Sequence, residues 1–476
     1  MSLHDRKDAL TERLREYDQE HVLQFWPELS HGERRTLLSQ LERIDFEQLA
    51  ELIQRLVLSE PLPPKVENIS PAPYVPLPQS EAEKQTFRAM WAEGTRVIEA
   101  GKVAALVVAG GAGTRLDFDG PKGAFPISPI RGKPLFQLFA EYLQAIGRDH
   151  GVAIPWYVMT SESNHEETIK FFKTHKHFGL APEQVRFFTQ GTMPAVDFDG
   201  KLLLAAKGSL ALSPDGHGGT LTALRNSGAL EQMQTEGTEV LSYFQVDNPL
   251  VRCVDPAFIG YHLAAAARMS SKMVTKLHAL ERVGNFCQTA DGRVAVIEYS
   301  DLPQTLARQT DEGGKLRFLA GSIAIHLIQV DFVDELTAGG GVSLPFHRAK
   351  KEVPFLDAYG QLQDPAKPNG VKFERFIFDA LPLAEKAITL ETRRKSEFSP
   401  VKNASGADSP ESARHDLVQR AARWLEGVGV KIPRDGNGDC EATIEISPLF
   451  AWHSGKLVDR ITRDMTIRPG ESIYIE

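Results

Sequence analysis

The chain has little cysteine, no long apolar run and no excess of basic residues, and each absence excludes a class of protein. Its three cysteines, Cys253, Cys287 and Cys440, are far apart, so they form neither a zinc-ligand spacing nor an even disulfide set. No stretch approaches about 18 uninterrupted apolar residues, and the charged start MSLHDRKDALTERLREYD lacks the apolar core of a signal peptide. These features predict a cytoplasmic protein with reduced thiols and no membrane insertion.

The balance of charge argues against nucleic acid as a partner. The formal net charge is -9, whereas a nucleic-acid-binding domain usually carries a basic excess. Any site for an anion must therefore be local. What remains is an ordinary globular composition, with 42% hydrophobic and 25% charged residues. Because 476 residues exceed the length that one core usually serves, we expect a large central domain with smaller flanking ones.

Two helix starts mark the N-terminal region. Ser30 with Glu33 forms a capping-box pattern, Asp45 with Gln48 repeats the signal, and apolar residues at helical spacing follow each pair. A proline-rich stretch from Pro61 to Pro78 then excludes regular helix and predicts an extended linker. Residues 1–80 are thus predicted to be a helical unit with its linker.

The central region alternates between short apolar runs and helix-length segments. A helix is expected over about Ser80 to Ala100, and the alternation after it predicts a parallel, doubly wound α/β sheet in a catalytic domain over residues 81–395. The apolar runs are Val103 to Ala109, Ile154 to Thr160, Val185 to Thr189 and Val240 to Val246.

The pattern changes beyond about Lys395. A turn-rich stretch leads to one expected helix near Ser412 to Gly427, and two strand-like pieces follow at Ala442 to Ile446 and Met465 to Ile475. Residues 396–476 are therefore predicted to form a small C-terminal α+β domain.

The strongest chemical signal is the glycine-rich stretch LVVAGGAGTRLDFDGPKG, residues 106–123. Its glycines follow a buried strand, at the carboxyl end where open α/β sheets bind ligands. Glycines let backbone N–H groups approach anionic oxygens without an intervening Cβ. Arg115 and Lys122 supply the fixed cations that transfer of a nucleotidyl group requires, because the α-phosphorus is surrounded by negative oxygens.

Two other interpretations of this loop are weaker. A dinucleotide-binding turn would need the last glycine of G-x-G-x-x-G and an acidic residue about 20 positions further on, and GGAGTRL provides neither. A purely structural turn between strand and helix leaves Arg115 and the Pro121-Lys122-Gly123 sequence unexplained. Phosphate binding accounts for all of these residues.

The G-G-x-G-T-R-L motif with the following P-K-G resembles the sugar 1-phosphate nucleotidyltransferases. Five further blocks make the chain most similar to the UDP-N-acetylhexosamine pyrophosphorylase family, over nearly its whole length. The resemblance implies a glycosyltransferase-A-like (GT-A-like) nucleotide-binding domain that joins UTP to a sugar 1-phosphate with Mg²⁺ and releases pyrophosphate. The blocks are FFTQGTMPAVDFDGK, SPDGHGGTLTAL, QVDNPLVRCVDPAFIGYH, KPNGVKFERFIFDALP and EFSPVKNASGADSPESAR.

The resemblance also implies roles for residues on the nucleotide side. Arg115 and Lys122 match the catalytic cations that hold the triphosphate, Gln190 matches the glutamine that reads the base, and Asp247 matches the aspartate that holds Mg²⁺. A glutamine amide can pair with uracil, and a hard carboxylate suits Mg²⁺. The other implied nucleotide-binding residues are Ala109, Gly110, Gly111, Gly216 and Lys372.

On the sugar side, the resemblance implies roles for Glu298 and Tyr299 at the sugar hydroxyls and for Lys402 at the sugar phosphate. His217 and Ser322 occupy two further sugar-facing positions at which the family usually has Asn. His at the first position resembles the UDP-glucose and general UDP-sugar pyrophosphorylases. We therefore expect an enzyme with relaxed selectivity for the sugar, with N-acetylglucosamine 1-phosphate as the first substrate and glucose 1-phosphate as the alternative.

Two rival function classes remain for comparison. A nicotinamide oxidoreductase is disfavoured by the spacing of the glycine loop. A non-catalytic regulator that binds UDP-sugars would tolerate loss of the cations, whereas Arg115, Lys122 and Asp247 are all present. The expected partners are UTP and a sugar 1-phosphate, with no nucleic acid, no membrane and no obligate protein partner.

Overall fold

The contacts within the chain divide it into two compact units, each assembled from segments that are distant in sequence. Unit 1 comprises Met1–Lys65, Gln190–Thr222 and Ser343–Asp379, and unit 2 comprises Val66–Thr189, Ala223–Val342 and Ala380–Glu476. This computed structural model describes residues 2–59, 68–340, 344–462 and 465–476. The domain boundaries at residues 80 and 395 stay a prediction, and the first prolines of the predicted linker lie outside the described residues.

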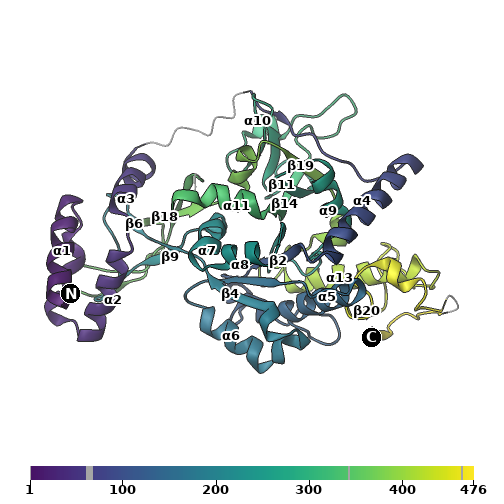
Figure 1. Cartoon of the computed structure of the whole chain (residues 1–476), viewed down its shortest axis with the longest axis horizontal. Helices are drawn as coiled ribbons and strands as arrows, with labels where there is room; N and C mark the ends of the chain where they lie inside the picture. The colour runs from purple at the N-terminus through teal and green to yellow at the C-terminus, as the bar shows by residue number, and fades with distance from the viewer. Residues whose placement is uncertain (1, 60–67, 341–343, 463–464) are drawn as a thin grey trace. The chain divides into compact units, whose positions relative to one another are not determined.

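A ten-stranded sheet forms the centre of unit 2 (Figure 1), with β1-β12-β14-β10-β2-β3-β4 as its main path. The four apolar runs predicted from the sequence are four neighbouring strands of this sheet, and each pair of neighbours is parallel. Nearly all side chains of β10, β2 and β3 are buried, as expected for strands that are covered on both faces, whereas β4 is buried in part. These strands are β10 (Val240–Gln245), β2 (Val103–Val108), β3 (Trp156–Thr160) and β4 (Val185–Thr189).

The predicted parallel pairing holds for these four strands but not for the rest of this sheet. β14 pairs antiparallel with β10, with β11 and with β12. The regular alternation of strand and helix ends at β11, since β12 and β13 follow it directly and pair antiparallel with each other. The fold is therefore mixed α/β. The strands concerned are β11 (Met269–Thr275), β12 (Asn285–Gln288), β13 (Val294–Ile297), β14 (Ala320–Gln329) and β19 (Ala387–Glu391), with β1 (Ser70–Pro71) at one edge.

Helices of unit 2 pack closely on this sheet and on one another. The helix expected over about Ser80 to Ala100 is α4, and Ser80 caps it. A Cβ on Gly94 of α4 would lie 1.8 Å from the carbonyl oxygen of Pro256, and one on Gly260 of α9 would lie 1.9 Å from that of Met90. Only glycine permits this approach of the two backbones. The helices are α4 (Glu81–Glu99), α5 (Leu135–His150), α6 (His165–Thr174), α8 (Ala229–Thr235), α9 (Pro256–Ala264), α10 (Gln304–Ala307), α11 (Val330–Thr337) and α12 (Arg394–Glu397).

Unit 1 packs three N-terminal helices against a small antiparallel sheet, β15-β18-β6. Both predicted helix starts are confirmed, because Ser30 and Glu33 form a capping box and Asp45 accepts the N–H of Gln48. The helices are α1 (Leu3–Glu16), α2 (His31–Glu42) and α3 (Phe46–Ile53), and the strands are β15 (Phe346–Lys351), β18 (Gly370–Arg375) and β6 (Val196–Asp197). Short pairs complete the unit: β5 (Thr192–Pro194) with β9 (Leu212–Pro214), β7 (Leu204–Ala206) with β8 (Ser209–Leu210), and β16 (Phe355–Leu356) with β17 (Leu362–Gln363). Helix α7 (Thr220–Asn226) continues from unit 1 into unit 2.

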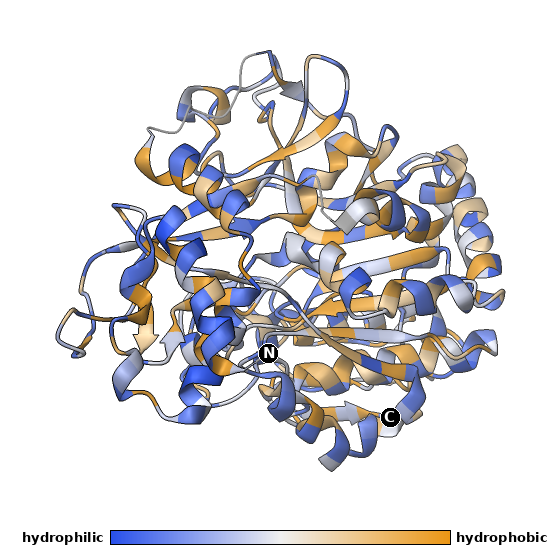
Figure 2. Cartoon of the chain, turned by 60° about the vertical axis from the view of Figure 1, so that its left-hand side comes forward, coloured by the Kyte–Doolittle hydropathy of each residue, from blue (hydrophilic) through white to orange (hydrophobic). Residues whose placement is uncertain are grey.

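The C-terminal elements belong to unit 2. Helix α13 (Pro410–Glu426) confirms the expected helix, and β20 (Thr443–Ile446) pairs in parallel with β21 (Ser472–Ile475). They surround a small hydrophobic core of their own, while Leu417 and Trp452 pack into the core of the large sheet. In Figure 2, hydrophobic residues lie on the strands and on one side of many helices.

Two observations bear on the compartment predicted from the sequence. Among the described helices, none combines the length and the apolar character that crossing a membrane requires. All three cysteines are free thiols, and Cys253 and Cys287 are buried.

Candidate active site

The glycine-rich loop begins directly after β2, where the carboxyl end of the strand leaves the sheet. Its backbone is fixed by bonds from Gly113 N–H to the Gly120 carbonyl (2.9 Å) and from Lys122 N–H to the Gly111 carbonyl (3.1 Å). The side-chain amide of Asn164 also donates to the Ala109 carbonyl at 3.0 Å. A Cβ built on Gly111 meets nothing within 4 Å. These hydrogen bonds fix the loop, and the backbone at Gly111 remains accessible to a ligand.

Four charged side chains of unit 2 gather beside this loop. Burial lowers the pKa of the Lys122 ammonium, the Asp247 carboxylate raises it, and Arg115 and Lys402 lower it again. Lys122 Nζ donates to the carbonyl oxygen of Val401 at 3.3 Å. The charges of Arg115, Asp247 and Lys402 thus act on Lys122, although up to 287 positions separate these four residues in the sequence.

Asn248 holds the two segments that carry Asp247 and Lys402. Its amide donates to the Glu397 carbonyl at 2.7 Å, and its side-chain oxygen accepts the N–H of Ser399 at 3.1 Å. The N–H of Val401 also donates to the backbone carbonyl of Asp247 at 2.8 Å. Asn248 is only 4% exposed, so these bonds are protected from water and fix the end of β10 against residues 397–401.

In unit 1, Gln190 lies beside a buried ion pair. Asp215 Oδ2 accepts from Arg375 Nη2 at 2.8 Å, and the Gln190 amide nitrogen lies 3.5 Å from the carbonyl oxygen of Gly216. Burial raises the pKa of the Asp215 carboxyl, whereas Arg375 and Gln190 favour its charged form. The predicted base reader therefore sits against a carboxylate and a carbonyl, both hydrogen-bond acceptors.

His217 is held in one neutral tautomer. Burial and the neighbouring His347 lower the pKa of its imidazole to about 4, and the ring stacks on Phe376 with 5.4 Å between centroids. The backbone N–H of Ile377 donates to its Nδ1 at 3.2 Å. Nδ1 is therefore unprotonated, and the proton of the neutral ring is on Nε2. The side chain offers one hydrogen-bond donor and carries no charge near pH 7.

Glu298 and Ser322, two of the residues predicted for the sugar side, lie close together in unit 2, whereas His217 belongs to unit 1. A Cβ on Gly284 would lie 3.6 Å from both Glu298 Oε1 and Ser322 Cβ, so these two side chains face the same position. Tyr299 follows Glu298 and is 47% exposed. Asn285 is 2% exposed, and its Oδ1 accepts from Lys276 Nζ at 2.6 Å. The protein itself engages the Asn285 amide, which makes this residue a support for the site.

The residues fit a magnesium ion that is shared with phosphate. In the described part of the chain, no three His, Cys, Asp or Glu side chains are grouped as a metal cage. Mg²⁺ often needs only one or two carboxylates, because waters and substrate phosphates complete its octahedron. Asp247 lies at the end of β10, and no hydrogen bond within the described residues engages its carboxylate oxygens. Its chemistry suits a metal that arrives with a nucleotide.

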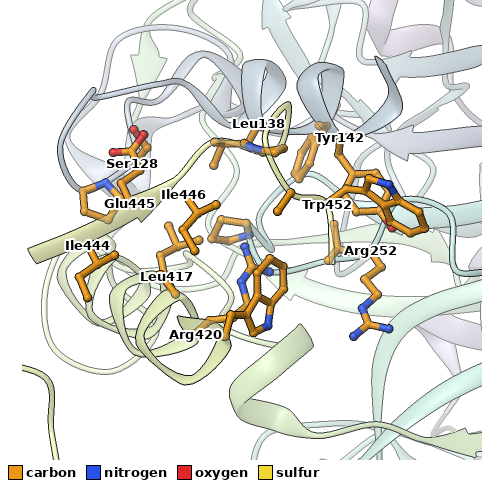
Figure 3. Close-up of a pocket in the computed structure, with 18 residues that line it drawn as sticks. Ser128, Leu138, Tyr142, Arg252, Leu417, Arg420, Ile444, Glu445, Ile446 and Trp452 are labelled. Carbon is orange, nitrogen blue, oxygen red and sulfur yellow. The ribbon is translucent and has the colours of Figure 1, made fainter. Parts of the chain in front are cut away.

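An enclosed cavity of about 50 Å³ lies elsewhere in unit 2, between α5, α13 and β20. Figure 3 shows Arg420, Tyr142 and Trp452 around it. Every predicted site residue lies in the described part of the chain, and none of them lines this cavity. We assign it no role in binding UTP or the sugar.

Sequence reasoning missed three contributors to the site. Arg375 lies in a block that carried the resemblance, but its pairing with Asp215 had no sequence signal because 160 positions separate them. Asn248 follows a predicted strand, where a turn residue is the ordinary interpretation. The Val401 carbonyl is a backbone group that no side-chain pattern could reveal. Lys372 lies on β18, and its predicted role stays a prediction.

A mixed α/β sheet with a glycine-rich loop beyond β2, and with three cations and a carboxylate beside that loop, is the arrangement of a nucleotidyltransferase. The chain belongs to the family described as UTP–glucose-1-phosphate uridylyltransferase, which matches residues 63–423. The predicted class of uridylyltransferases is thereby confirmed.

Individual relatives cover almost the whole chain. It is 38% identical to the human UDP-N-acetylhexosamine pyrophosphorylase-like protein 1, over 92% of each chain. It is 36% identical to UDP-N-acetylglucosamine diphosphorylase 2 of Arabidopsis thaliana, over 96% of this chain and 92% of that one. The crystal structure of the Trypanosoma brucei UDP-N-acetylglucosamine pyrophosphorylase in complex with inhibitor covers 98% of each chain, at 26% identity and a TM-score of 0.77.

Proposed function

We propose that this protein transfers the uridylyl group of UTP to N-acetylglucosamine 1-phosphate, releasing pyrophosphate. Family membership supports the reaction, and the names of the relatives described above support the acetamido sugar. The observation that carries the proposal is the group of Arg115, Lys122, Lys402 and Asp247 beside the open backbone of the glycine loop. A protein that only bound UDP-sugars would have no need of this concentration of charge.

The chemistry is a direct displacement at phosphorus. A phosphate oxygen of the sugar 1-phosphate attacks the α-phosphorus of UTP, the bond between the α-phosphorus and its bridging oxygen breaks, and pyrophosphate takes the electron pair. Arg115 and Lys122 hold the triphosphate oxygens, and Lys402 neutralises the attacking sugar phosphate. Fixed cations are the main help that a protein gives to such a transfer. No covalent intermediate with the protein is needed.

We propose Asp247 as the protein ligand of Mg²⁺. When bound, the ion neutralises charge on the phosphate oxygens. The remaining work falls to the chain itself: the lysines orient the phosphates, and Asn248 keeps the segments of Asp247 and Lys402 in register. The free thiols fit a cytoplasmic location, and we infer no obligate protein partner.

Glucose 1-phosphate is the second candidate substrate, and His217 is the observation that favours it. Its Nε2–H can donate to the carbonyl of an acetamido group or to a sugar hydroxyl. Unlike the amide that is usual in the family, it offers no acceptor for the acetamido N–H. The swap therefore weakens selection for the acetamido group without preventing its binding.

A panel of sugar 1-phosphates with UTP and Mg²⁺, followed by pyrophosphate release, tests the proposal. We expect turnover with N-acetylglucosamine 1-phosphate and slower but measurable turnover with glucose 1-phosphate. Tight binding of UDP-N-acetylglucosamine without any pyrophosphate release would instead identify a regulator.

A further inference from the structure

We propose that Asp215 is a positioning residue, which fixes the orientation of the Gln190 amide so that the site accepts uracil and rejects cytosine. The inference rests on the proposed function, because it takes Gln190 as the reader of the nucleotide base. It explains why the Gln190 amide keeps one orientation of its oxygen and nitrogen.

The side-chain amide of Gln190 can adopt two orientations that differ by a half turn, which exchanges the places of its oxygen and nitrogen. Uracil offers an N3–H donor beside the O4 acceptor, whereas cytosine offers an N3 acceptor beside an amino donor. Pairing with uracil needs the glutamine oxygen at N3 and its nitrogen at O4. Pairing with cytosine needs the reverse. A glutamine that turns freely would serve both bases, so selection requires that something oppose the turn.

The structure supplies two groups that oppose it. The Gln190 nitrogen points to the Gly216 carbonyl oxygen at 3.5 Å, and the amide lies close enough to Asp215 to favour its charged form. After a half turn, the Gln190 oxygen would face a carbonyl and a carboxylate at once. Two contacts between acceptors, one of them with a full charge, would be repulsive. In the observed orientation, one proton of the Gln190 nitrogen can point to these acceptors and the other to O4 of the base. The Gln190 oxygen makes no hydrogen bond within the described residues and stays available for the N3–H.

Asp215 cannot move aside to relieve this repulsion. It is 3% exposed and bound to Arg375, and the backbones of two glycines lie so close to its carboxylate that neither position has room for a side chain. A Cβ on Gly219 would lie 2.0 Å from Asp215 Oδ1, and one on Gly191 would lie 3.0 Å from Oδ2. Oδ1 is buried with no hydrogen-bond partner in the described part of the chain. The carboxylate is thus held by Arg375 on one oxygen, while the other remains an open acceptor.

The test replaces Asp215 by Asn, which has the same shape but can place an NH₂ where Oδ1 now lies. That donor would satisfy the Gln190 oxygen after the half turn. We expect the preference for UTP over CTP in kcat/KM, ~10⁴ in the parent for a site of this kind, to fall at least about tenfold, chiefly through a lower KM for CTP. Dissociation constants for UTP and CTP, measured by calorimetry without sugar phosphate, should move in the same direction.

Two further variants separate positioning from general damage. Arg375→Met breaks the same ion pair but keeps the carboxylate, so both nucleotides should lose activity in parallel and their ratio should stay within about threefold of the parent. In a Gln190→Ala background, Asp215→Asn should leave the ratio unchanged. The double variant Asp215→Asn with Arg375→Met removes the buried guanidinium together with its partner, so it keeps the test available if the single variant does not fold.

The outcomes are distinct. If Asp215→Asn keeps the parent ratio, or if Arg375→Met lowers the ratio as far, the positioning role is wrong while the proposed function stands. If the parent releases no pyrophosphate from UTP with any sugar 1-phosphate, the proposed function fails, and the calorimetric ratio of UTP to CTP still decides the orientation of the amide.

Discussion

The phosphate-side group of unit 2 and the recognition group of unit 1 differ in how their charges are arranged. The first consists of Arg115, Lys122, Lys402 and Asp247, and its cations repel one another around a single carboxylate. The second consists of Gln190, Asp215, Arg375 and His217, whose charges are paired and whose imidazole is neutral.

This difference fits what each group is proposed to bind. Repelling cations are costly in the free protein, and a polyanion that binds among them relieves the repulsion. Stabilisation of this kind is available to a triphosphate and to its transition state. Recognition of a neutral base or sugar gains nothing from net charge. It depends on donors and acceptors that are fixed before the ligand arrives, and burial with full pairing achieves this.

The largest effect should come from the phosphate-side group. Removing one preorganised cation in Lys122→Ala should cost on the order of 2.5 to 4 kcal/mol in kcat, with a smaller loss of UTP binding. Steady-state kinetics with varied UTP measures both. The exposed Lys170 on α6 gives the matched control Lys170→Ala, which should behave as the parent. Near-normal turnover of Lys122→Ala would remove Lys122 from the chemistry.

Asp247→Asn should fold normally and lose most of its activity, because a neutral amide binds Mg²⁺ weakly. Loss of even an outer-shell partner costs about 10- to 100-fold in metal affinity, and a direct ligand should cost at least as much. Added Mg²⁺ should restore part of the rate, which titrations of the parent and of the exposed control Asp459→Asn would establish. An unchanged rate with an unchanged Mg²⁺ dependence would contradict the metal assignment.

Changes on the recognition side should alter selectivity more than rate. His217→Asn with Ser322→Asn should shift kcat/KM toward N-acetylglucosamine 1-phosphate over glucose 1-phosphate by about 1 to 3 kcal/mol, the usual scale for one or two pocket contacts. Measuring both sugars on the parent, on each single variant and on the double variant gives the coupling between the two positions. A constant ratio would show that the sugar is chosen elsewhere, with Glu298 the next position to change.

The smallest effect concerns acid stability. The pKa of His217 is lowered in the folded state to about 4, so the unfolded chain binds more protons between that pH and about 6.5. Folding stability should therefore fall as the pH is lowered through this window. In His217→Asn, the free energy of unfolding should fall by about 1 kcal/mol less than in the parent between pH 7 and pH 5. The complete pKa shift would give a larger difference, but His217 is partly exposed, which reduces it. Urea unfolding at the two pH values measures it, and an equal fall in both proteins would show that the ring is not held neutral.

The sequence predicted what local patterns encode. The parallel strands β10, β2, β3 and β4 were visible as apolar runs, and the helix starts at Ser30 and Asp45 as capping residues. The sequence did not predict the antiparallel pairing of β14, because strand direction depends on partners distant in the chain. The family resemblance gave the cations, while the tautomer of His217 and the pairing of Asp215 with Arg375 required three-dimensional neighbours.

The contact between Lys122 and the Val401 carbonyl has a consequence for how this sequence can vary. The acceptor is a main-chain oxygen, which every amino acid possesses, so no exchange of the side chain at position 401 deletes it. The Val401 side chain is itself fully buried in the core of unit 2. Replacements at this position are thus limited by the packing and polarity of the core, and Lys122 keeps this contact through any replacement that the core can accommodate.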